Sequence, residues 1–438
     1  MKQTICSVGD AILLEGFPDS YDIMPIKTIV EKADVRLFNL ENVLSDRAIY
    51  ASTYCGGTWL LAKEDTLDDT LRFGFNGCSF ANNHTMDFSY DGLFDTLAAA
   101  KKRNLPICGA GKDLEEASDY VVIETENGKC GLISICATFN DAARAGHPSE
   151  HLLGRPGLNP LRFSVEYHIT PEHMKALKEM SAGTHIDGRR NRSRMGGYTP
   201  MPPEGCFGFG EYNFRESEVE GKLSKVNAVD MARTENTIKK ALAVCDTVIV
   251  NIHSHEIKHD TDDEPDDFLI EFCRKCIDAG ASAVVGTGTH QLKAIELYKN
   301  KPIFYSLGNF IFQSDLVFCM PDDFREKYKL PYGLTARQQI AERAKLGNGG
   351  LHSDVNNFRS LMPFMTFESG SVERIVLYPL RLDMHTGLPA LADQAEAQII
   401  FDYLCDRNKQ FGTVMTLHNG VIEVNYNDQN RSLRAGAF

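Results

Sequence analysis

The chain has 438 residues, of which 43% are hydrophobic and 24% are charged. This balance is that of an ordinary globular protein and excludes a disordered or a fibrous chain. The formal net charge of −14 argues against nonspecific binding to nucleic acid or to an anionic membrane surface, because both repel a chain of the same sign.

The first predicted strand lies in the amino-terminal sequence MKQTICSVGDAILL. Gly9 and Asp10 interrupt its apolar run, so the segment lacks the apolar core and the cleavage site of a signal peptide. No uninterrupted apolar stretch in the chain reaches the roughly 18 to 20 residues that would span a bilayer. The 12 cysteines are scattered, which does not indicate a disulfide framework. We therefore expect a cytoplasmic protein without a membrane span.

Strand and helix patterns alternate from residue 1 to about 137, which is typical of βαβ units. Helices are predicted around 24–33, near 64–72 and at 91–102, and they separate the strands TICSVGDAILL, VRLFNLE and FNGCSFANN. The strands VVIETE and KCGLISIC are joined by Asn127-Gly128, a pair that accepts the positive φ angles of a tight hairpin turn. The predicted sheet is therefore mixed.

Residues 138 to about 226 break this rhythm. They contain a predicted helix at 171–181 and the glycine- and proline-rich stretch GTHIDGRRNRSRMGGYTPMPPEGCFGFGE. So long a loop is rare in an ordered domain unless it is functional or mobile. One interpretation is a disordered surface insertion, and the other is a lid whose arginines bind carboxylates or phosphates through forked donors. These arginines are Arg189, Arg190, Arg192 and Arg194.

The α/β pattern resumes from 228 to 312. Helices are predicted at 229–243 and 267–279, next to the strands DTVIVNIHSH and SAVVGTG. AIELYKN and KPIFYSLGNFIF read as a second hairpin with Asn300 and Lys301 at its turn.

The last part of the chain begins with a polar, loosely patterned region from about 315 to 356. The strands FMTFESG and SVERIVLYPLRL, a helix at 391–407 and the hairpin TVMTLHNGVIEV follow it. We predict a single α/β domain over residues 1–438, with insertions at about 138–226 and 315–356.

Metal-type ligands follow several of the predicted strands. Ligands in open α/β sheets bind beyond the carboxyl ends of the strands, so side chains placed there converge on one pocket. Carboxylate oxygen, amide oxygen and imidazole nitrogen together suit a hard or borderline divalent cation such as Mn, Mg, Zn, Fe or Ca. We predict one or two ions per chain. The predicted ligands are Asp10, Glu41, Asn83, His253 and His255.

Several of these residues also allow a structural interpretation. Asp10 could simply cap the turn after its strand, whereas Glu41 follows an apolar run in which an unpaired carboxylate is costly without a cation. His253 and His255 alternate on one strand and would face the same side. A lone buried histidine is usually structural, but two followed by Glu256 favour a site.

The same segments offer residues for proton transfer. His84 directly follows the ligand Asn83, and Asp87 is three residues further on, where it could hold the His84 ring. His290 is the imidazole at the end of VVGTGTH and could serve as a ligand or as an acid or base. Asn309 in SLGNF is expected to shape the floor of the pocket through hydrogen bonds to the backbone.

The order and spacing of these motifs resemble those of the CapA family, the poly-γ-glutamate capsule synthesis proteins. The segments that carry the resemblance are VGD at 8–10, NLE at 39–41, ANNHTMDFSYDG at 81–92, HSHE at 253–256, YSLGNFIFQ at 305–313, PLRFSVEYHI at 160–169 and ALADQAEAQIIFDYL near the carboxyl end. The resemblance implies the fold of the calcineurin-like metallophosphatases, a mixed β-sandwich flanked by helices in four αββα layers, with the metal site at one sheet edge.

The resemblance also implies roles for residues. Asp10, Glu41, Asn83 and His253 look like metal ligands, and His84 looks like the acid that follows the ligand asparagine. The family's last motif usually reads GHGPH, whereas this chain has Gly-Thr-Gly-Thr-His at 286–290. Thr287 therefore stands where a histidine is expected, and His255 or Glu256 could compensate.

Three functions follow as hypotheses. The first is a metal-dependent enzyme that hydrolyses or transfers a γ-glutamyl, other peptide-like or phosphoester substrate, with His84 or His290 moving the proton. The second, also implied by the resemblance, is a metal-dependent peptide epimerase in which Asp10 and His290 face each other as base and acid. The third is a non-catalytic assembly factor for poly-γ-glutamate or another polymer. The first two predict an anionic substrate, which the insertion arginines would bind.

Overall fold

Two mixed β-sheets form the centre of the protein in the computed structural model, which describes residues 2–260, 264–347 and 349–425. The first sheet has the order β23-β24-β21-β20-β1-β2-β5-β6, with β19 also paired to β1 and β22 to β21. β1 is parallel to β2 and β19 and antiparallel to β20. The strands are β1 Lys2–Ile12, β2 Val35–Leu40, β5 Gly77–Ser79, β6 Ile107–Cys108, β19 Asn309–Phe312, β20 Arg359–Glu368, β21 Ser371–Leu382, β22 Pro389–Leu391, β23 Val414–His418 and β24 Val421–Asn425.

The second sheet has the order β17-β18-β16-β15-β9-β8. β15 is parallel to both β9 and β16. The β8–β9 pair is the predicted antiparallel hairpin, but its turn lies one residue earlier than predicted, because Glu126 and Asn127 form it and Gly128 already pairs with Thr125. Its strands are β8 Val121–Thr125, β9 Gly128–Cys136, β15 Thr247–Ser254, β16 Ala283–Gly288, β17 Ile295–Tyr298 and β18 Lys301–Phe304.

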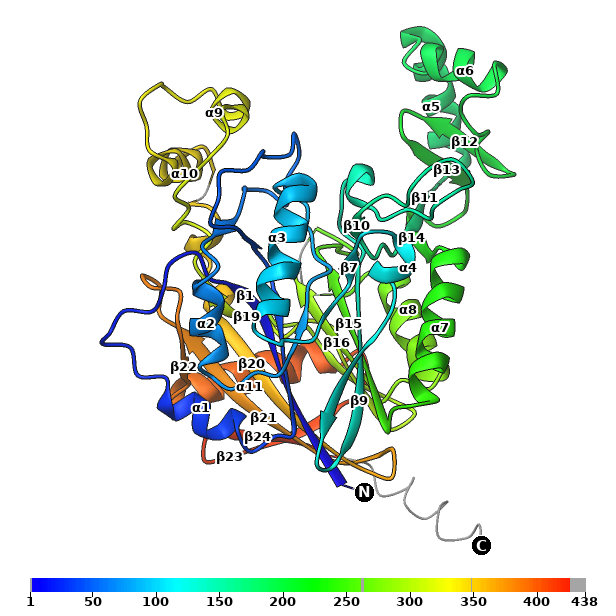
Figure 1. Cartoon of the computed structure of the whole chain (residues 1–438). Coiled ribbons are helices and arrows are strands. Elements are labelled where there is room, and N and C mark those ends of the chain that lie inside the picture. The colour runs from blue at the N-terminus through cyan, green and yellow to red at the C-terminus, as the bar shows by residue number, and fades with distance from the viewer. Residues whose placement is uncertain (1, 261–263, 348, 426–438) are drawn as a thin grey trace, which may run out of the picture.

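The two sheets pack face to face, with helices on both outer faces (Figure 1). On β15, Ile249 belongs to the core between the sheets and Val250 to the core under α7 and α8, because successive side chains of a strand point to opposite faces. The helices α1, α2 and α3 cover the other sheet, and α11 contacts β17, β21 and β23. The predicted four-layer αββα arrangement is confirmed. The helices are α1 Met24–Val30, α2 Thr66–Leu71, α3 Ser89–Lys102, α7 Ala228–Leu242, α8 Asp267–Asp278 and α11 Gln394–Asn408.

The chain crosses from the second sheet to the first between β18 and β19. The predicted strand KPIFYSLGNFIF is therefore two strands, and β19 lies beside β1. The crossing brings the backbones of Gly9 and Gly308 together, and a Cβ atom on Gly9 would lie 1.8 Å from the Gly308 carbonyl oxygen. Gly9 is thus required for the close approach of β1 to the segment before β19.

The predicted turn of the second hairpin was wrong by one residue. Lys299 and Asn300 form the turn, with φ angles of 50° and 61°, whereas Lys301 already pairs with Tyr298 in the ladder. Both turn residues have the positive φ that a tight two-residue turn requires.

Residues 163–226 form an ordered unit that projects beyond the carboxyl end of β15 (Figure 1). It consists of a four-stranded sheet, in the order β12-β13-β11-β14, together with two helices. The glycine- and proline-rich stretch thus contains a helix and a strand, and whether the unit acts as a lid stays a prediction. Its elements are β11 Phe163–Ile169, α5 Pro171–Thr184, α6 Gly188–Met195, β12 Cys206–Phe209, β13 Tyr212–Glu216 and β14 Gly221–Val226.

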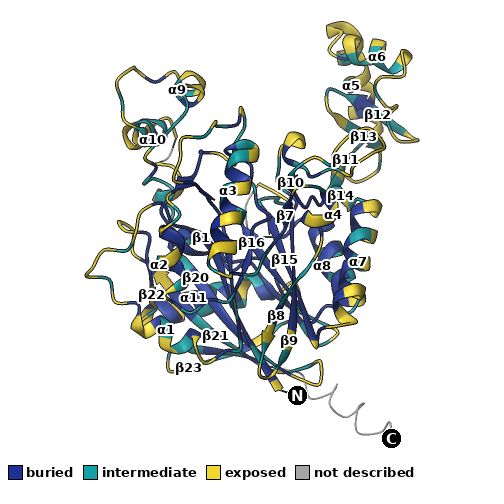
Figure 2. Cartoon of the chain, in the orientation of Figure 1, coloured by how far each residue is buried: buried dark blue, intermediate teal, exposed yellow. Residues whose placement is uncertain are grey.

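The second insertion also projects from this end of the sandwich, on the opposite side in Figure 1. The polar region from 315 to 356 contains two helices that the sequence pattern did not predict, α9 Asp322–Tyr328 and α10 Ala336–Lys345. Figure 2 shows that both insertions are largely exposed, whereas the sandwich strands are buried. None of the helices in the described part of the chain combines the length and the apolar character that a bilayer crossing requires.

Short elements complete the fold. They are β3 Val43–Leu44, which pairs with β4 Leu61–Ala62, β7 Ala110–Gly111, which pairs with β10 Gly157–Leu158, α4 Leu114–Ala117, and the 3₁₀ turns Asp141–Ala143, Leu351–Ser353 and Val355–Phe358.

Candidate metal centre

The predicted ligands converge because both sheets present the carboxyl ends of parallel strands to the same edge. Asp10 lies near the end of β1, Glu41 directly follows β2, and Asn83 lies in the loop after β5. From the other sheet, His253 lies near the end of β15 and His290 follows β16. The sandwich therefore brings residues separated by up to 280 positions in sequence to one site, as the nearness of Asp10 and His290 shows.

Glu41 is the most unusual residue of the site. Its side chain is 0% exposed, and neither carboxylate oxygen has a hydrogen-bond partner. Three imidazole Nε2 atoms surround one of these oxygens, at 3.6 Å for His253 and 4.0 Å for both His84 and His255. Burial, followed by the nearby Asp10 and Asp87 carboxylates, raises the pKa of Glu41 well above its usual range. A cation would remove this cost.

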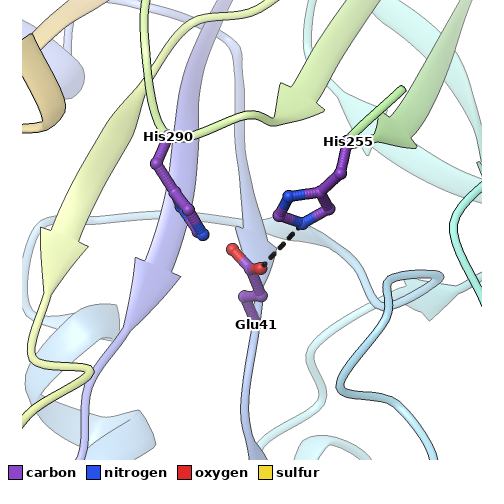
Figure 3. Close-up of side chains that lie close together, drawn as sticks. All are labelled: Glu41, His255 and His290. Atoms are coloured by element: carbon purple, nitrogen blue, oxygen red, sulfur yellow. Dashed lines mark ion pairs between the residues drawn. The ribbon is translucent and has the colours of Figure 1, made fainter. Parts of the chain in front are cut away.

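Two sets of donor atoms share Glu41. Glu41, His255 and His290 form one set, and Asp10, Glu41 and His253 form the other, with the donor atoms within each set lying within 4.8 Å of one another. Figure 3 shows the first set, in which the imidazoles of His255 and His290 approach the Glu41 carboxylate from two sides. The arrangement fits one ion or two ions that share Glu41 as a ligand.

His253 of β15 and His255 of the loop that follows it bring their Nε2 atoms close together. His253 Nε2 lies 3.2 Å from His255 Nε2 and 2.8 Å from the amide oxygen of Asn83. Two ring nitrogens at this separation match neighbouring ligands of a tetrahedral ion with metal–nitrogen bonds of about 2.0 to 2.1 Å. Burial, followed by the neighbouring His253 and His290 rings, lowers the pKa of His255 well below its usual value, so its ring is neutral and able to bind a metal.

Asp10 is fully buried and held in a fixed orientation. One oxygen accepts a hydrogen bond of 2.8 Å from the Asn39 side chain, and the other accepts one of 2.9 Å from the Gly288 backbone N–H. Burial raises the pKa of Asp10, but the nearby His253 and His290 rings and the Asn39 amide outweigh it and bring the pKa below its ordinary value. Asp10 is therefore a carboxylate at neutral pH.

Thr287, which replaces the expected histidine, contacts the candidate ligand His253. Its hydroxyl lies 3.0 Å from Nδ1 of His253 and leaves the ring's Nε2 to face Asn83 and Glu41. A group that bonds the second nitrogen of a ligating histidine fixes the ring's orientation. This chain thus has an uncharged hydroxyl group, which holds the His253 ring, at the position where the family motif has an imidazole.

His84 and Asp87 form a hydrogen-bonded pair. His84 Nδ1 lies 2.7 Å from a carboxylate oxygen of Asp87. That carboxylate also accepts hydrogen bonds from the backbone N–H groups of Gly56 and Leu60. Burial raises the pKa of Asp87 even though the His84 ring opposes the shift. The fixed Nδ1 contact directs Nε2 of His84 toward Glu41.

His290 is held by Asn309. Its Nδ1 lies 2.8 Å from the Asn309 side-chain oxygen, and the Asn309 amide donates to the His290 and Asn357 backbone oxygens. Burial lowers the pKa of His290 to about 4, against the opposing effects of Asp10 and Asn309. The ring is therefore neutral at pH 7. His290 itself has a φ angle of 60°, a left-handed conformation that marks the tight turn after β16.

Glu256 lies beside the candidate metal ligand His255. One carboxylate oxygen accepts a hydrogen bond of 3.2 Å from the Thr138 hydroxyl, which in turn accepts one from the backbone N–H of His255. Glu256 thus acts on the site through the loop that carries His255. The sequence pattern did not single out Thr138, and no local signal distinguishes it from other threonines.

A cavity of about 240 Å³ opens onto the donor atoms. Its lining includes the side chains of His84, His255 and His290, and on another wall Thr58, Arg343 and Leu351. Asp10 is fully buried and is not among the lining residues.

The arginines predicted to bind substrate lie elsewhere. All four belong to α6, in the unit that projects away from the sandwich (Figure 1). Arg190 pairs with Glu211 in the same unit, at 3.2 Å. The arginine that lines the cavity is Arg343 of α10. A sequence signal for α10 does exist, because Thr335 and Gln338 form a capping box at its start.

Comparisons with known proteins agree with the motifs. The chain is 28% identical over 440 residues to the uncharacterized protein y4uA of Sinorhizobium fredii, which covers 95% of this chain and 92% of that protein. It is 26% identical over 239 residues to the PGA biosynthesis protein CapA of Bacillus subtilis, with 54% of this chain and 43% of that protein covered. For the capsule biosynthesis protein CapA of Bacillus anthracis, the identity is 24% over 321 residues, with 71% and 60% covered.

Two further comparisons concern the structure and the family. A solved structure described as a novel phosphatase from Mycoplasma pneumoniae aligns with 87% of this chain and 94% of that chain, with a TM-score of 0.39 and 12% identity. The family model described as bacterial capsule synthesis protein PGA_cap matches residues 4–314, which is more than half of the chain. The chain therefore belongs to the bacterial capsule synthesis protein family PGA_cap.

Proposed function

We propose that the protein is a metal-dependent enzyme that hydrolyses or transfers a γ-glutamyl, other peptide-like or phosphoester group. The observation that carries this proposal is the Glu41 carboxylate, which is fully buried and unpartnered but surrounded by three imidazoles beside an open cavity. A purely structural site would not retain such a group, because an unpaired buried charge is strongly unfavourable.

The donor set fits a divalent cation. The residues that would hold it are Asp10, Glu41, Asn83, His253 and His255, with His290 as a further donor. When bound, the metal would supply Lewis-acid polarisation of a carbonyl or phosphoryl oxygen. The mixture of carboxylate, amide and imidazole donors suits Mn, Fe and Zn, and Mg or Ca to the extent that oxygen donors dominate.

His84 is the residue we assign to proton transfer. Asp87 accepts a hydrogen bond at Nδ1 of His84, so the neutral ring carries its lone pair on Nε2, on the side that lines the cavity. From there it can take a proton from an attacking water and return it to a leaving group. The buried Asp87 carboxylate keeps the ring in this tautomer and stabilises its charged form.

Epimerisation of a peptide is the second candidate. The expected base and acid, Asp10 and His290, lie close together, with a carboxylate oxygen 3.9 Å from Nδ1 of His290, and His84 lines the same cavity as His290. Two proton-carrying groups in one cavity are what removal and return of an α-proton requires. A non-catalytic assembly factor is the remaining alternative, and it requires neither bound metal nor His84.

One experiment separates the three. The purified chain is analysed for metal by mass spectrometry and incubated in deuterated water with γ-glutamyl peptides and with p-nitrophenyl phosphate. Hydrolysis or transfer releases product, whereas epimerisation incorporates deuterium without cleavage. We expect His84→Gln to lose about 10²- to 10⁴-fold in rate, the usual contribution of a positioned acid or base, and to keep its metal, while His385→Gln, an exposed control, keeps both.

The assembly-factor alternative predicts the opposite pattern. The proposed enzyme would be excluded if the purified chain held far less than one metal ion and if the His84→Gln variant functioned as well as the wild type.

A further inference from the structure

The cavity has a positively charged wall that the donor set does not explain. Arg343 of α10 lines the cavity, together with Thr58, Leu351 and the imidazoles of His84, His255 and His290. The Arg343 guanidinium donates a hydrogen bond of 3.0 Å to the Thr58 hydroxyl. This is a neutral partner, so the contact orients the guanidinium without neutralising it.

No ion pair with another described residue balances the charge of Arg343. Three other cations of this insertion do have carboxylate partners, since Arg337 pairs with Glu15, Lys345 with Glu342, and Arg325 with Asp322. Within residues 2–260, 264–347 and 349–425, no carboxylate lies within ion-pair distance of Arg343.

Aromatic rings fix the position of this guanidinium. It lies 5.6 Å from the ring centre of Phe324 and 6.0 Å from that of Tyr328, both on α9. Cation–π contacts of this kind hold a guanidinium in place and leave its N–H groups available to an anion. The helix pair α9 and α10 thus presents a preoriented anion-binding group to the cavity.

We propose that Arg343 binds an anionic group of the substrate, a carboxylate or a phosphate, next to the group that reacts at the imidazoles. This inference rests on the proposed function and narrows its substrate class. The cavity volume of about 240 Å³ lies below the range of about 300 to 1,000 Å³ that is usual for pockets enclosing a drug-sized ligand. The cavity therefore takes one small anionic unit of a substrate, and a longer chain would extend out of it.

The charge of the whole chain makes such a group necessary. With a formal net charge of −14, the protein repels an anion at long range, and the site itself contains the carboxylates Asp10 and Glu41. An anionic substrate needs a local cation, and Arg343 supplies a forked donor that matches both carboxylate and phosphate.

An intrinsic tryptophan of the chain can report anion binding by its fluorescence. Trp59 is the single tryptophan, it directly follows Thr58, and it is held by a hydrogen bond of 2.9 Å from its indole N–H to the Ser52 carbonyl oxygen. An anion bound to Arg343 beside Thr58 changes the surroundings of Trp59. Its fluorescence can therefore be titrated with inorganic phosphate, with glutarate and with neutral glutaramide, and calorimetry gives the same affinities independently.

The variants are Arg343→Met and Arg343→Lys, with Arg337→Met as the matched control on the same helix. Methionine keeps the apolar stem that packs on Phe324 and Tyr328. We expect Arg343→Met to weaken binding of the preferred anion by about 10- to 100-fold, the loss typical of a charge-assisted hydrogen bond. Arg343→Lys is expected to lose less, and Arg337→Met to match the wild type.

The outcomes are distinct. Tighter binding of glutarate assigns a carboxylate, tighter binding of phosphate assigns a phosphate, and glutaramide should not bind. Anion affinity that is unchanged in Arg343→Met, or absent in the wild type, overturns the inference. Each titration is run with Mn²⁺ and with chelator, and bound metal is counted in each sample. If the wild type and Arg343→Met hold the same metal but bind anions equally, the inference fails while the proposed function stands.

Discussion

Replacement of Glu41 by glutamine should separate metal binding from folding. In the metal-free protein the wild-type carboxylate is buried beside Asp10 without a hydrogen-bond partner, so it opposes folding at neutral pH. A neutral amide removes that charge and can donate to the imidazole nitrogens of His253 or His255. We therefore expect metal-free Glu41→Gln to be at least as stable as the metal-free wild type.

The metal-loaded proteins should show the reverse order. Glu41 belongs to both donor sets, so its loss weakens every ion at the site. Free metal at 100 times its Kd stabilises the wild type by about 2.7 kcal/mol. For 438 residues, the entropy of unfolding is about 0.9 kcal/mol/K near 60 °C, so the wild-type melting temperature should rise by about 3 °C. The variant should show little or no rise.

The assay is thermal unfolding with chelator and with added Mn²⁺ or Zn²⁺, together with counting of bound metal. Glu396→Gln is the control, because Glu396 is also buried but accepts a hydrogen bond of 2.6 Å from Arg359. It should destabilise the protein equally with and without metal. The reasoning is refuted if Glu41→Gln shows the same metal-induced rise as the wild type, or if it is less stable than the wild type in chelator.

Two further predictions concern other parts of the molecule. Gly56→Ala should lower activity, because its Cβ atom would lie 2.5 Å from the Asn83 amide nitrogen and 2.7 Å from the His84 ring and would displace both side chains. Bound metal and reaction rate are measured on the same sample, and wild-type values for both would contradict this displacement. In the projecting sheet, the Arg215 hydrogen bond lowers the pKa of Glu166 from 4.5 to about 2. A carboxyl group whose pKa is lowered by folding stabilises the native state above pH 4.5, and this stabilisation is lost as the pH falls toward 2. The stability deficit of Glu166→Gln, measured by denaturant titration, should therefore shrink between pH 5 and pH 3. A deficit that stays constant over this range would contradict the lowered pKa.

The donor residues could be predicted from sequence because each one follows a strongly apolar strand. The run VRLFNL could only be a buried strand, and a carboxylate placed directly after it, as in Glu41, has few stable options other than a cation. The same reasoning located Asp10 and His253. Parallel strands present their carboxyl ends to one edge, so the pattern alone predicted that these residues meet.

The substrate-side residues could not be predicted in this way. The arginines of α6 were expected near the site because their forked donors suit carboxylates and phosphates, but a cluster of charges carries no information about the direction in which its segment projects. Arg343 was missed because the region from 315 to 356 is polar and loosely patterned. Its helices are held by contacts with the rest of the chain, such as the Arg343 hydrogen bond to Thr58.

The amino-acid sequence by itself determined the layers of the fold and the kinds of donor that reach the candidate metal centre. Periodicity along the chain records which face of each element is buried, and this is local information. Only the tertiary structure decided that Glu41 belongs to both donor sets, that Thr287 supports His253, and that Arg343 rather than Arg189 or Arg194 lines the cavity. Those facts depend on the packing of segments distant in sequence, because a side chain's neighbours across a sandwich are set by the register and twist of both sheets and not by its own segment.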